Sequence, residues 1–295
     1  MALSVSNKEE NMVTTEGISG GMKVILNRPR KLNALNYQLI VQMLRMLESH
    51  EYDPTIKFII LKGNGKAFCA GGDVTSVMTL TNAGNWSFGA NFFRKQYSLD
   101  YLLGTYKKPL IAIINGIVMG GGAGLSMHAA FRIVTENTIF AMPEASIGSV
   151  PDVGEYVALT GVRLNGIELV QCGLATHFVH SKDLASLENA LSMMASSDAK
   201  NTTKISEIIN KYANERDIKT ENANSRLEII NKCFSRETVE DILLALETFA
   251  VERNEKWIFD AIKSIKSASP LCIKLALKLV NQNKVNPHKL QVKMS

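Results

Sequence analysis

The sequence predicts an α/β fold followed by a helical C-terminal region, and two observations support this prediction. Between residues 15 and 183, short apolar runs typical of buried strands alternate with segments of helical periodicity, which indicates mostly parallel or mixed strand pairing. From residue 184 onward, every segment has apolar residues at helical spacing. We therefore predict an α/β core over residues 15–183 and a helical region over residues 184–295.

The predicted elements follow from local signals along the chain. Apolar runs predict strands over residues 22–26, 58–61, 110–114, 131–134 and 138–140. Asn36 is expected to cap a helix that ends at Asp53-Pro54, because proline disfavours helical geometry in the residue before it. Asp73 is expected to begin a short helix, and a longer helix is predicted over residues 86–103. The C-terminal helices are predicted over residues 185–195, 204–214, 225–234, 239–250, 257–265 and 271–280.

The composition is that of an ordinary soluble globular protein. The 295 residues are 46% hydrophobic and 21% charged, with a net charge of +5 that slightly favours anionic partners. The basic residues are scattered rather than striped, so we expect no nucleic-acid partner. The four cysteines are widely separated and form no CxxC pair, which favours buried thiols over disulfides or a metal site.

An uncharged stretch between Lys108 and Arg132 is long enough to cross a membrane. Glycines crowd its centre, however, so a buried strand followed by a glycine-rich turn explains it better, and we expect no membrane association. The N-terminal residues lack the apolar segment of a secretion signal and make a poor transit peptide. The last four residues, 292–295, are not a peroxisomal signal, so the sequence leaves the compartment open.

Several familiar catalytic motifs are absent from the sequence. Residues 63–66 lack the spacing of a P-loop, and no GxGxxG follows a strand. The run from Gly124 to His128 resembles a GxSxG nucleophile elbow, but His128 stands in place of the last glycine, which disfavours a serine hydrolase. His177 and His180 are expected to have no partner acids nearby.

Two glycine loops of similar design remain. Residues 67–73 follow the strand at 58–61, and residues 119–122 follow the strand at 110–114. Each loop begins a helix, so two helix N-termini on neighbouring strands could direct two amides at one oxygen, which is the geometry of an oxyanion hole. For either loop taken alone, simple turn residues are the better explanation.

Two acids form the third element. Glu144 follows a short apolar strand and Pro143, and Asp152 comes eight positions later. Such a pair can divide the work, with one carboxylate acting on a thioester or water and the other binding a hydroxyl. The alternative is that both are helix caps or solvated loop acids.

Taken together, these segments resemble the crotonase (enoyl-CoA hydratase/isomerase) superfamily. The matching stretches are LNRPRKLNALN (26–36), KAFCAGGD (66–73), KKPLIAIINGIVMGGGAGLS (107–126) and FAMPEASIGSVPDVG (140–154). GNW (84–86), MGGGAGLSMH (119–128) and GLATHFV (173–179) resemble the 3-hydroxyisobutyryl-CoA hydrolase branch, in a plant-like and apparently shortened form. The resemblance implies a ClpP/crotonase-like fold of ββα units and a mitochondrial or peroxisomal compartment. Crotonase folds commonly form trimers, but the hydrolase branch leaves open whether this chain is a monomer or a homo-oligomer.

The same resemblance implies hydrolysis of 3-hydroxyisobutyryl-CoA in valine catabolism. Hydratases of the superfamily carry a catalytic glutamate where this chain has Gly124, so hydration of an enoyl double bond is disfavoured. An enoyl-CoA hydratase or isomerase, or a CoA-binding protein without activity, remains the alternative. No cofactor or metal is expected, because CoA is part of the substrate.

The resemblance also assigns roles to individual residues. The thioester carbonyl would lie between the amides of Gly72 and Gly121, and Glu144 would act as nucleophile or as base for water. Asp152 would accept the 3-hydroxyl of the substrate or orient water. Gln96 would also bind the substrate, and its amide stands where the family usually has an acid. Ala67 and Ala70 would lie near the adenine of CoA, and Arg28 and Lys31 near its phosphates. Asp73, at the end of the first loop, is the last predicted substrate-binding residue.

Overall fold

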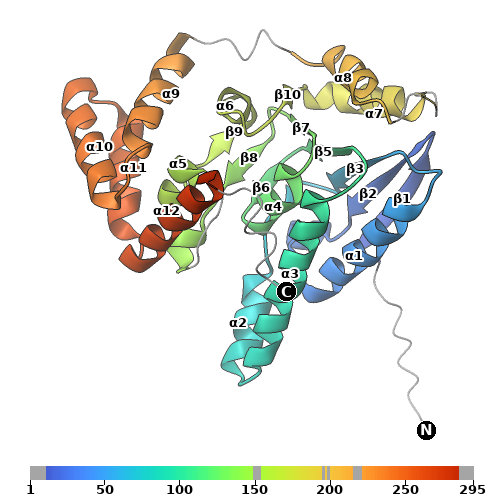
Figure 1. Ribbon diagram of the computed structural model, residues 1–295, viewed down its shortest axis with the longest axis horizontal. Coiled ribbons are helices and arrows are strands. Elements are labelled where there is room, and N and C mark those ends of the chain that lie inside the picture. Colours follow the sequence, from blue (N-terminus) through green and yellow to red (C-terminus); the bar gives the residue numbers. More distant parts are fainter. Residues whose placement is uncertain (1–10, 149–153, 195–196, 198–199, 215–220, 286–295) are drawn as a thin grey trace.

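The computed structural model describes residues 11–148, 154–194, 197, 200–214 and 221–285, and it contains two β-sheets (Figure 1). The six-stranded sheet has the order β1-β2-β3-β5-β7-β10 and is parallel except for the β1–β2 pair. The four-stranded sheet has the order β4-β6-β8-β9 and is parallel except for β8–β9. The strands are β1 Val13–Ile18, β2 Gly21–Leu26, β3 Phe58–Gly63, β4 Ala67–Cys69, β5 Leu110–Ile114, β6 Ile117–Met119, β7 Phe131–Val134, β8 Ile139–Ala141, β9 Leu164–Asn165 and β10 His177–Phe178.

From β3 to β8, consecutive strands alternate between the two sheets. β3, β5 and β7 belong to the larger sheet, and the strand that follows each of them, β4, β6 or β8, belongs to the smaller one. A helical segment follows each such pair, which confirms the predicted fold of ββα units. These segments are α2 Val74–Asn82 and α3 Trp86–Gly104 after β4, α4 Gly121–Met127 after β6, and η2 Glu144–Ile147 and α5 Glu155–Thr160 after β8.

The central strand β3 is buried on both faces. Ile59 and Leu61 belong to the main core with helix α1 (Tyr37–Tyr52), whereas Phe58 and Ile60 belong to a second core. Burial on both faces explains why this strand has a continuous apolar run rather than an alternating pattern. The second core is completed by α7 (Leu184–Ser192) and α8 (Thr202–Asn210), which cover the other face of the larger sheet.

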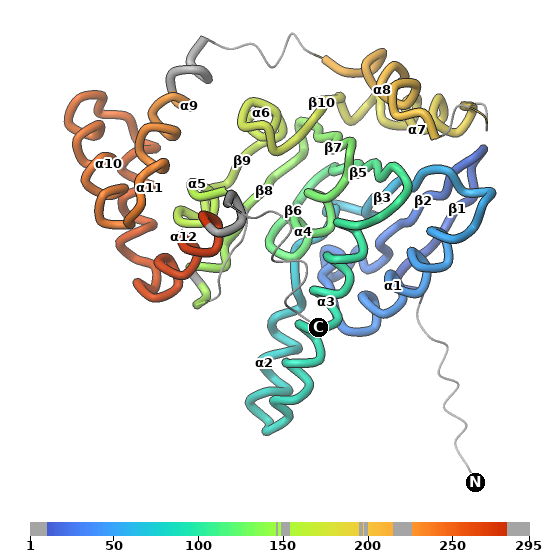
Figure 2. Tube along the Cα trace, viewed as in Figure 1, coloured from blue at the N-terminus to red at the C-terminus, as the bar shows by residue number. Residues whose placement is uncertain are grey.

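The remaining helices form a group beside the smaller sheet, apart from α7 and α8 (Figure 2). They are α9 Glu221–Phe234, α10 Val239–Arg253, α11 Lys256–Ser267 and α12 Pro270–Val285. The group packs on α5, where the ring of Tyr156 lies 5.1 Å from that of Phe234 and 6.2 Å from that of Trp257. The division at residue 183 stays a prediction, since α7 and α8 pack on the sheet of the core.

The predicted helix starts are confirmed at two caps. The side chain of Asn36 accepts a hydrogen bond from the amide of Leu39, and Asp73 accepts one from the amide of Ser76. Each helix predicted after residue 184 has a counterpart among the described residues, although α8 ends at Asn210 rather than at residue 214. None of the described helices is long and apolar enough to span a bilayer. The short elements not yet named are η1 Pro29–Lys31, α6 Gly166–Gln171 and η3 Ser181–Asp183.

Candidate active site

Three neighbouring parallel strands of the smaller sheet end at the same edge, and the candidate residues follow them. Gly72 follows β4, Gly121 follows β6 and Glu144 follows β8. Both glycine loops come after the long strands β3 and β5, as predicted, but the intervening strands β4 and β6 were not predicted. A three-residue strand lies between each long strand and its loop, and this places the loops in a second sheet.

The first glycine loop is held by Leu35. The amide of Leu35 donates to the carbonyl of Gly71 over 2.8 Å, and the amide of Asp73 donates to the carbonyl of Leu35 over 2.8 Å. A side-chain carbon built on Gly71 would lie 3.6 Å from the amide nitrogen of Gly121, so the two loops meet. Gly121 is the first residue of α4, and its N–H has no carbonyl partner within that helix. The meeting of the two loops supports the predicted oxyanion hole.

Gln96 extends from α3 over both glycines. A Cβ built on Gly121 would lie 2.6 Å from Nε2 of Gln96, and one built on Gly72 would lie 3.8 Å from its Oε1. The side-chain amide of Gln96 therefore lies next to the place where a thioester carbonyl is expected. Its assignment to substrate binding stays a prediction.

Glu144 lies against the same turn. A Cβ built on Gly120 would lie 2.5 Å from Oε1 of Glu144, and the other carboxylate oxygen is sealed from solvent. Gly120 has a φ of +49° and a ψ of −125°, a backbone conformation that residues other than glycine rarely adopt. The carboxylate is thus next to the start of α4 and to the amide of Gly121.

The carboxylate of Asp100 lies close to Gly124. A Cβ built on Gly124 would lie 3.0 Å from Oδ1 of Asp100, a carboxylate that comes from α3. Sequence reasoning did not select Asp100, although it follows Gln96 by four residues, the spacing that places two side chains on one helix face.

The residues expected to meet CoA are placed on the first loop and before it. Nη2 of Arg28 lies 3.3 Å from Oδ2 of Asp73, and Arg28 also donates to the carbonyl of Ala34, whereas Lys31 is exposed. Burial raises the pKa of Asp73, but hydrogen bonds from Ser76 and Arg28 outweigh burial and hold that pKa below its ordinary value. The pairing leaves Arg28 engaged with protein groups, and its contact with CoA phosphates stays a prediction.

The two alanines differ in exposure. Ala67 is buried in β4, whereas Ala70 is partly exposed and donates its amide to the carbonyl of Leu32. Their proximity to the adenine stays a prediction, as does every role of Asp152, which lies outside the described residues.

Asn33 is a structural residue that the sequence analysis missed. It is fully buried with a φ of +54°, accepts a hydrogen bond from the amide of Arg28 and donates to the carbonyls of Asn64 and Ala67. These bonds join the turn after β2 to the loop that leads into β4. An asparagine inside a turn is the available signal, because asparagine tolerates positive φ.

We expect Asn33→Ala to lower the free energy of unfolding by about 2–3 kcal/mol, because it leaves buried backbone groups without partners. Urea denaturation measures this value. Asn64→Ala is the matched control, since its side chain pairs with Asn27 at the surface and its own carbonyl is retained. Equal loss in both variants would contradict this account of Asn33.

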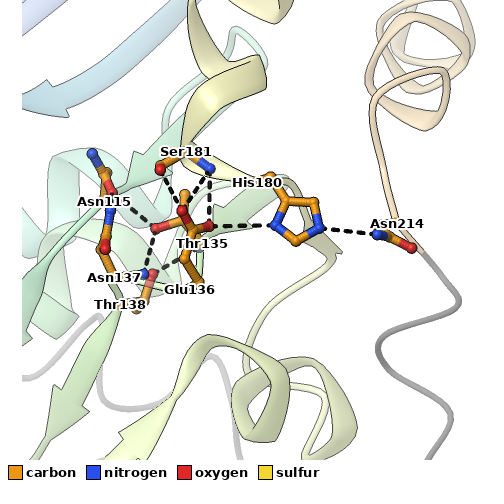
Figure 3. Close-up of polar contacts among 8 residues, drawn as sticks. All are labelled: Asn115, Thr135, Glu136, Asn137, Thr138, His180, Ser181 and Asn214. Atoms are coloured by element: carbon orange, nitrogen blue, oxygen red, sulfur yellow. Dashed lines mark hydrogen bonds and ion pairs between the residues drawn. The ribbon is translucent and has the colours of Figure 1, made fainter.

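A second polar cluster joins Glu136, His180 and Ser181 (Figure 3). Ser181 donates both its amide and its hydroxyl to the carboxylate of Glu136, and Nδ1 of His180 lies 3.7 Å from the same carboxylate. The expectation that His180 has no partner acid nearby was therefore wrong. The serine donates to the acid rather than to the imidazole, which is not the order of a catalytic triad. With Asn214 beyond the ring, the cluster connects the β7–β8 turn, the start of η3 and the segment that follows α8.

The Glu136 cluster should stabilise the fold in a pH-dependent way. Burial raises the pKa of Glu136. Hydrogen bonds from Ser181, together with the electrostatic effect of His180, outweigh this effect of burial and hold the pKa below its ordinary value of 4.5. A lowered pKa in the folded state means that this contribution is complete above pH 4.5 and is lost as the pH falls below it. We expect Glu136→Gln to lower the melting temperature by about 2 °C at pH 7. The difference from wild type should vanish near pH 3, and one that persists there would contradict this explanation.

The cysteines are free thiols. Burial, and to a smaller extent the charge of Asp100, raise the pKa of Cys69 to about 12, so this thiol stays protonated beside the first glycine loop. Within the described ranges, the His, Cys, Asp and Glu side chains form no cluster of three or more that could hold a metal ion.

A cavity of about 280 Å³ lies between α6, α5 and α9. Its polar groups bind one another: Arg226 donates to Glu168 over 2.8 Å and to the hydroxyl of Tyr156 over 3.0 Å, and it lies over the ring of Trp257. None of the predicted site residues lines this cavity, so we interpret it as part of the joint between the core and the α9–α12 group.

Comparisons with known proteins show the family to which the chain belongs. The family described as enoyl-CoA hydratase/isomerase matches residues 22–293. The chain is 44% identical to 3-hydroxyisobutyryl-CoA hydrolase 1 of Arabidopsis thaliana, over 96% of this chain and 78% of that protein. It is 36% identical to the small ribosomal subunit protein mS47 of the same plant, over 93% and 70% of the two chains. Among solved structures, a carnitinyl-CoA dehydratase from Mycobacterium thermoresistibile matches with a TM-score of 0.79 and 28% identity, over 92% and 80%.

With two glycine loops that meet beside a buried carboxylate, the chain belongs to the enoyl-CoA hydratase/isomerase, or crotonase, family. Within this family it falls in the 3-hydroxyisobutyryl-CoA hydrolase branch, as the sequence motifs predicted.

Proposed function

We propose that this chain hydrolyses 3-hydroxyisobutyryl-CoA to 3-hydroxyisobutyrate and CoA, a step of valine catabolism. The observation that carries the proposal is the carboxylate of Glu144 against Gly120, next to the Gly121 amide, in a chain 44% identical to a named hydrolase of this thioester. CoA enters as part of the substrate, and the chemistry below needs no further cofactor.

The two glycine loops would stabilise the charge that develops on the carbonyl oxygen. As a nucleophile attacks the carbonyl carbon, one electron pair of the double bond moves to oxygen, and the amides of Gly72 and Gly121 donate hydrogen bonds to it. One such donor contributes roughly 3–4 kcal/mol to lowering a barrier of this kind. When the double bond re-forms, the carbon–sulfur bond breaks and CoA leaves as a thiolate.

Glu144 fits two routes to the same products. As a base, it takes one proton from water while the water oxygen bonds to the carbonyl carbon, and that proton later passes to the CoA thiolate. As a nucleophile, its oxygen bonds to the carbonyl carbon and CoA leaves, after which water cleaves the resulting anhydride and restores the carboxylate. Either route requires Glu144 to be ionised at the start.

Release of free thiol from 3-hydroxyisobutyryl-CoA, followed with a thiol-reactive dye, tests the proposal. Turnover by the purified chain supports it, and stable binding of the thioester without release of CoA would contradict it. Binding without turnover would instead indicate a CoA-binding protein without activity. One relative, 36% identical to this chain, is named as a ribosomal subunit protein rather than as an enzyme, which keeps this alternative in view.

Hydration of an enoyl-CoA is the second candidate function, because Asp100 brings a carboxylate to within 3.0 Å of a Cβ built on Gly124. With Glu144, the site then holds two acids near the start of α4, and two carboxylates can divide acid and base roles. Loss of crotonyl-CoA absorbance measures hydration directly. Hydration faster than thioester cleavage would favour this candidate over the hydrolase.

Association into a homo-oligomer, which is common among crotonase folds, is part of the proposal. Light scattering coupled to size-exclusion chromatography measures the mass in solution. A mass near 32.5 kDa, that of one chain, would contradict it.

A further inference from the structure

Helix α3 presents two polar side chains to α4, one helical turn apart. Gln96 lies over Gly121, and four residues later Asp100 lies over Gly124, with Oδ1 at 3.0 Å and Oδ2 at 3.7 Å from a Cβ built on that glycine. A glycine at position 124 leaves room for the carboxylate, since a Cβ at 3.0 Å would be unusually tight. The Gln96–Gly121 pair therefore lies at the predicted oxyanion hole, and the Asp100–Gly124 pair lies further along α4.

The position of Asp100 matches the length of a short 3-hydroxyacyl group. Gly124 follows Gly121 by three residues, a rise of about 4.5 Å along the helix axis. In the substrate, two carbon–carbon bonds of about 1.5 Å separate the carbonyl carbon from the carbon that bears the hydroxyl. With the carbonyl oxygen held at Gly121, that hydroxyl comes within reach of a carboxylate one turn further along α4.

The surroundings of Asp100 make it a strong and selective acceptor. Oδ1 is sealed from solvent, whereas the residue as a whole is only half-buried. The influence of its charge on Cys69, three residues before Gly72, shows that it also lies near the first glycine loop. A hydroxyl donates a stronger hydrogen bond to a carboxylate than to a neutral group, and a substrate without that hydroxyl cannot form this bond.

We propose that Asp100 is a specificity-determining residue that accepts a hydrogen bond from the 3-hydroxyl of the substrate. This inference rests on the proposed thioester hydrolase function. It assigns the hydroxyl to a residue of α3 and leaves to Asp152 the other predicted role, the orientation of water.

The test compares two thioesters that differ only in the hydroxyl, 3-hydroxyisobutyryl-CoA and isobutyryl-CoA. We expect Asp100→Ala to lower the ratio of their kcat/KM values at least about 10-fold, through loss on the hydroxylated substrate. Turnover of isobutyryl-CoA should change less than about 3-fold. Ser98→Ala is the matched control on α3, because its exposed hydroxyl donates to the carbonyl of Arg94 in the same helix, and it should leave the ratio unchanged.

An unchanged ratio, or equal loss on both thioesters, would overturn the role of Asp100 and leave the hydrolase function standing. If Asp100→Ala does not fold, as judged by circular dichroism, the nearly isosteric Asp100→Asn gives the same comparison. If the wild-type chain cleaves neither thioester, the proposed function fails, and the ratio of their dissociation constants decides the inference. The role of Asp100 is supported if the wild-type chain binds the hydroxylated thioester more tightly and Asp100→Ala removes this preference. Equal affinities in wild type, or no binding of either thioester, overturn that role.

Discussion

Replacing Glu144 by glutamine should lower kcat for cleavage of 3-hydroxyisobutyryl-CoA roughly 10³-fold or more. The amide retains the size of the side chain and its place against Gly120, but it can neither attack the carbonyl nor take a proton from water. Because the substitution leaves the predicted oxyanion hole and the predicted CoA contacts untouched, KM should change much less. Steady-state kinetics of thiol release measure both quantities.

Glu247→Gln is the matched control for this substitution. Glu247 lies on α10 and pairs with Lys266 at 2.7 Å, on an exposed surface outside the site. Its replacement should leave kcat unchanged. Turnover by Glu144→Gln at the wild-type rate would remove Glu144 from the mechanism in either of its roles.

Gly120→Ala should lower kcat about 100-fold, with a smaller effect on stability. The added Cβ would lie 2.5 Å from Oε1 of Glu144, so the carboxylate must move away from the start of α4. A displacement of about 1 Å at a reacting group can cost a factor of this size. The comparison of kcat with the melting temperature separates the displaced carboxylate from general damage.

Gly173→Ala is the control for backbone strain. Gly173 also has a positive φ, +73°, but a Cβ built there meets no atom within 4 Å. It should lower the melting temperature as Gly120→Ala does, and leave kcat unchanged. An equal loss of kcat in both variants would contradict the steric explanation.

Much of the fold was predictable because its signals are local. β3 and β5 are continuous apolar runs between charged or turn residues, and Asn36 and Asp73 have the side chains that cap helices. Each of these signals depends on residues a few positions apart. The glycine loops were predictable for the same reason, since glycine followed by a helix start is visible in the sequence.

The second sheet was not predictable from the same signals. β4 and β6 have three residues each, too few to show a period, and they become strands only by pairing with each other and with β8. Contacts between distant segments were also invisible. The proximity of Asp100 to Gly124 depends on how α3 crosses α4, and that of Glu136 to His180 depends on a turn 44 residues away.

We propose that the two glycine loops hold the thioester carbonyl beside Glu144. A crystal structure with a non-cleavable thioether or ketone analogue of the substrate that retains the carbonyl tests it most directly. We predict the carbonyl oxygen within about 2.7–3.1 Å of the amide nitrogens of Gly72 and Gly121, with the Glu144 carboxylate facing the carbonyl carbon. An analogue bound with its carbonyl away from both amides, for example in the cavity beside Arg226, would contradict the claim.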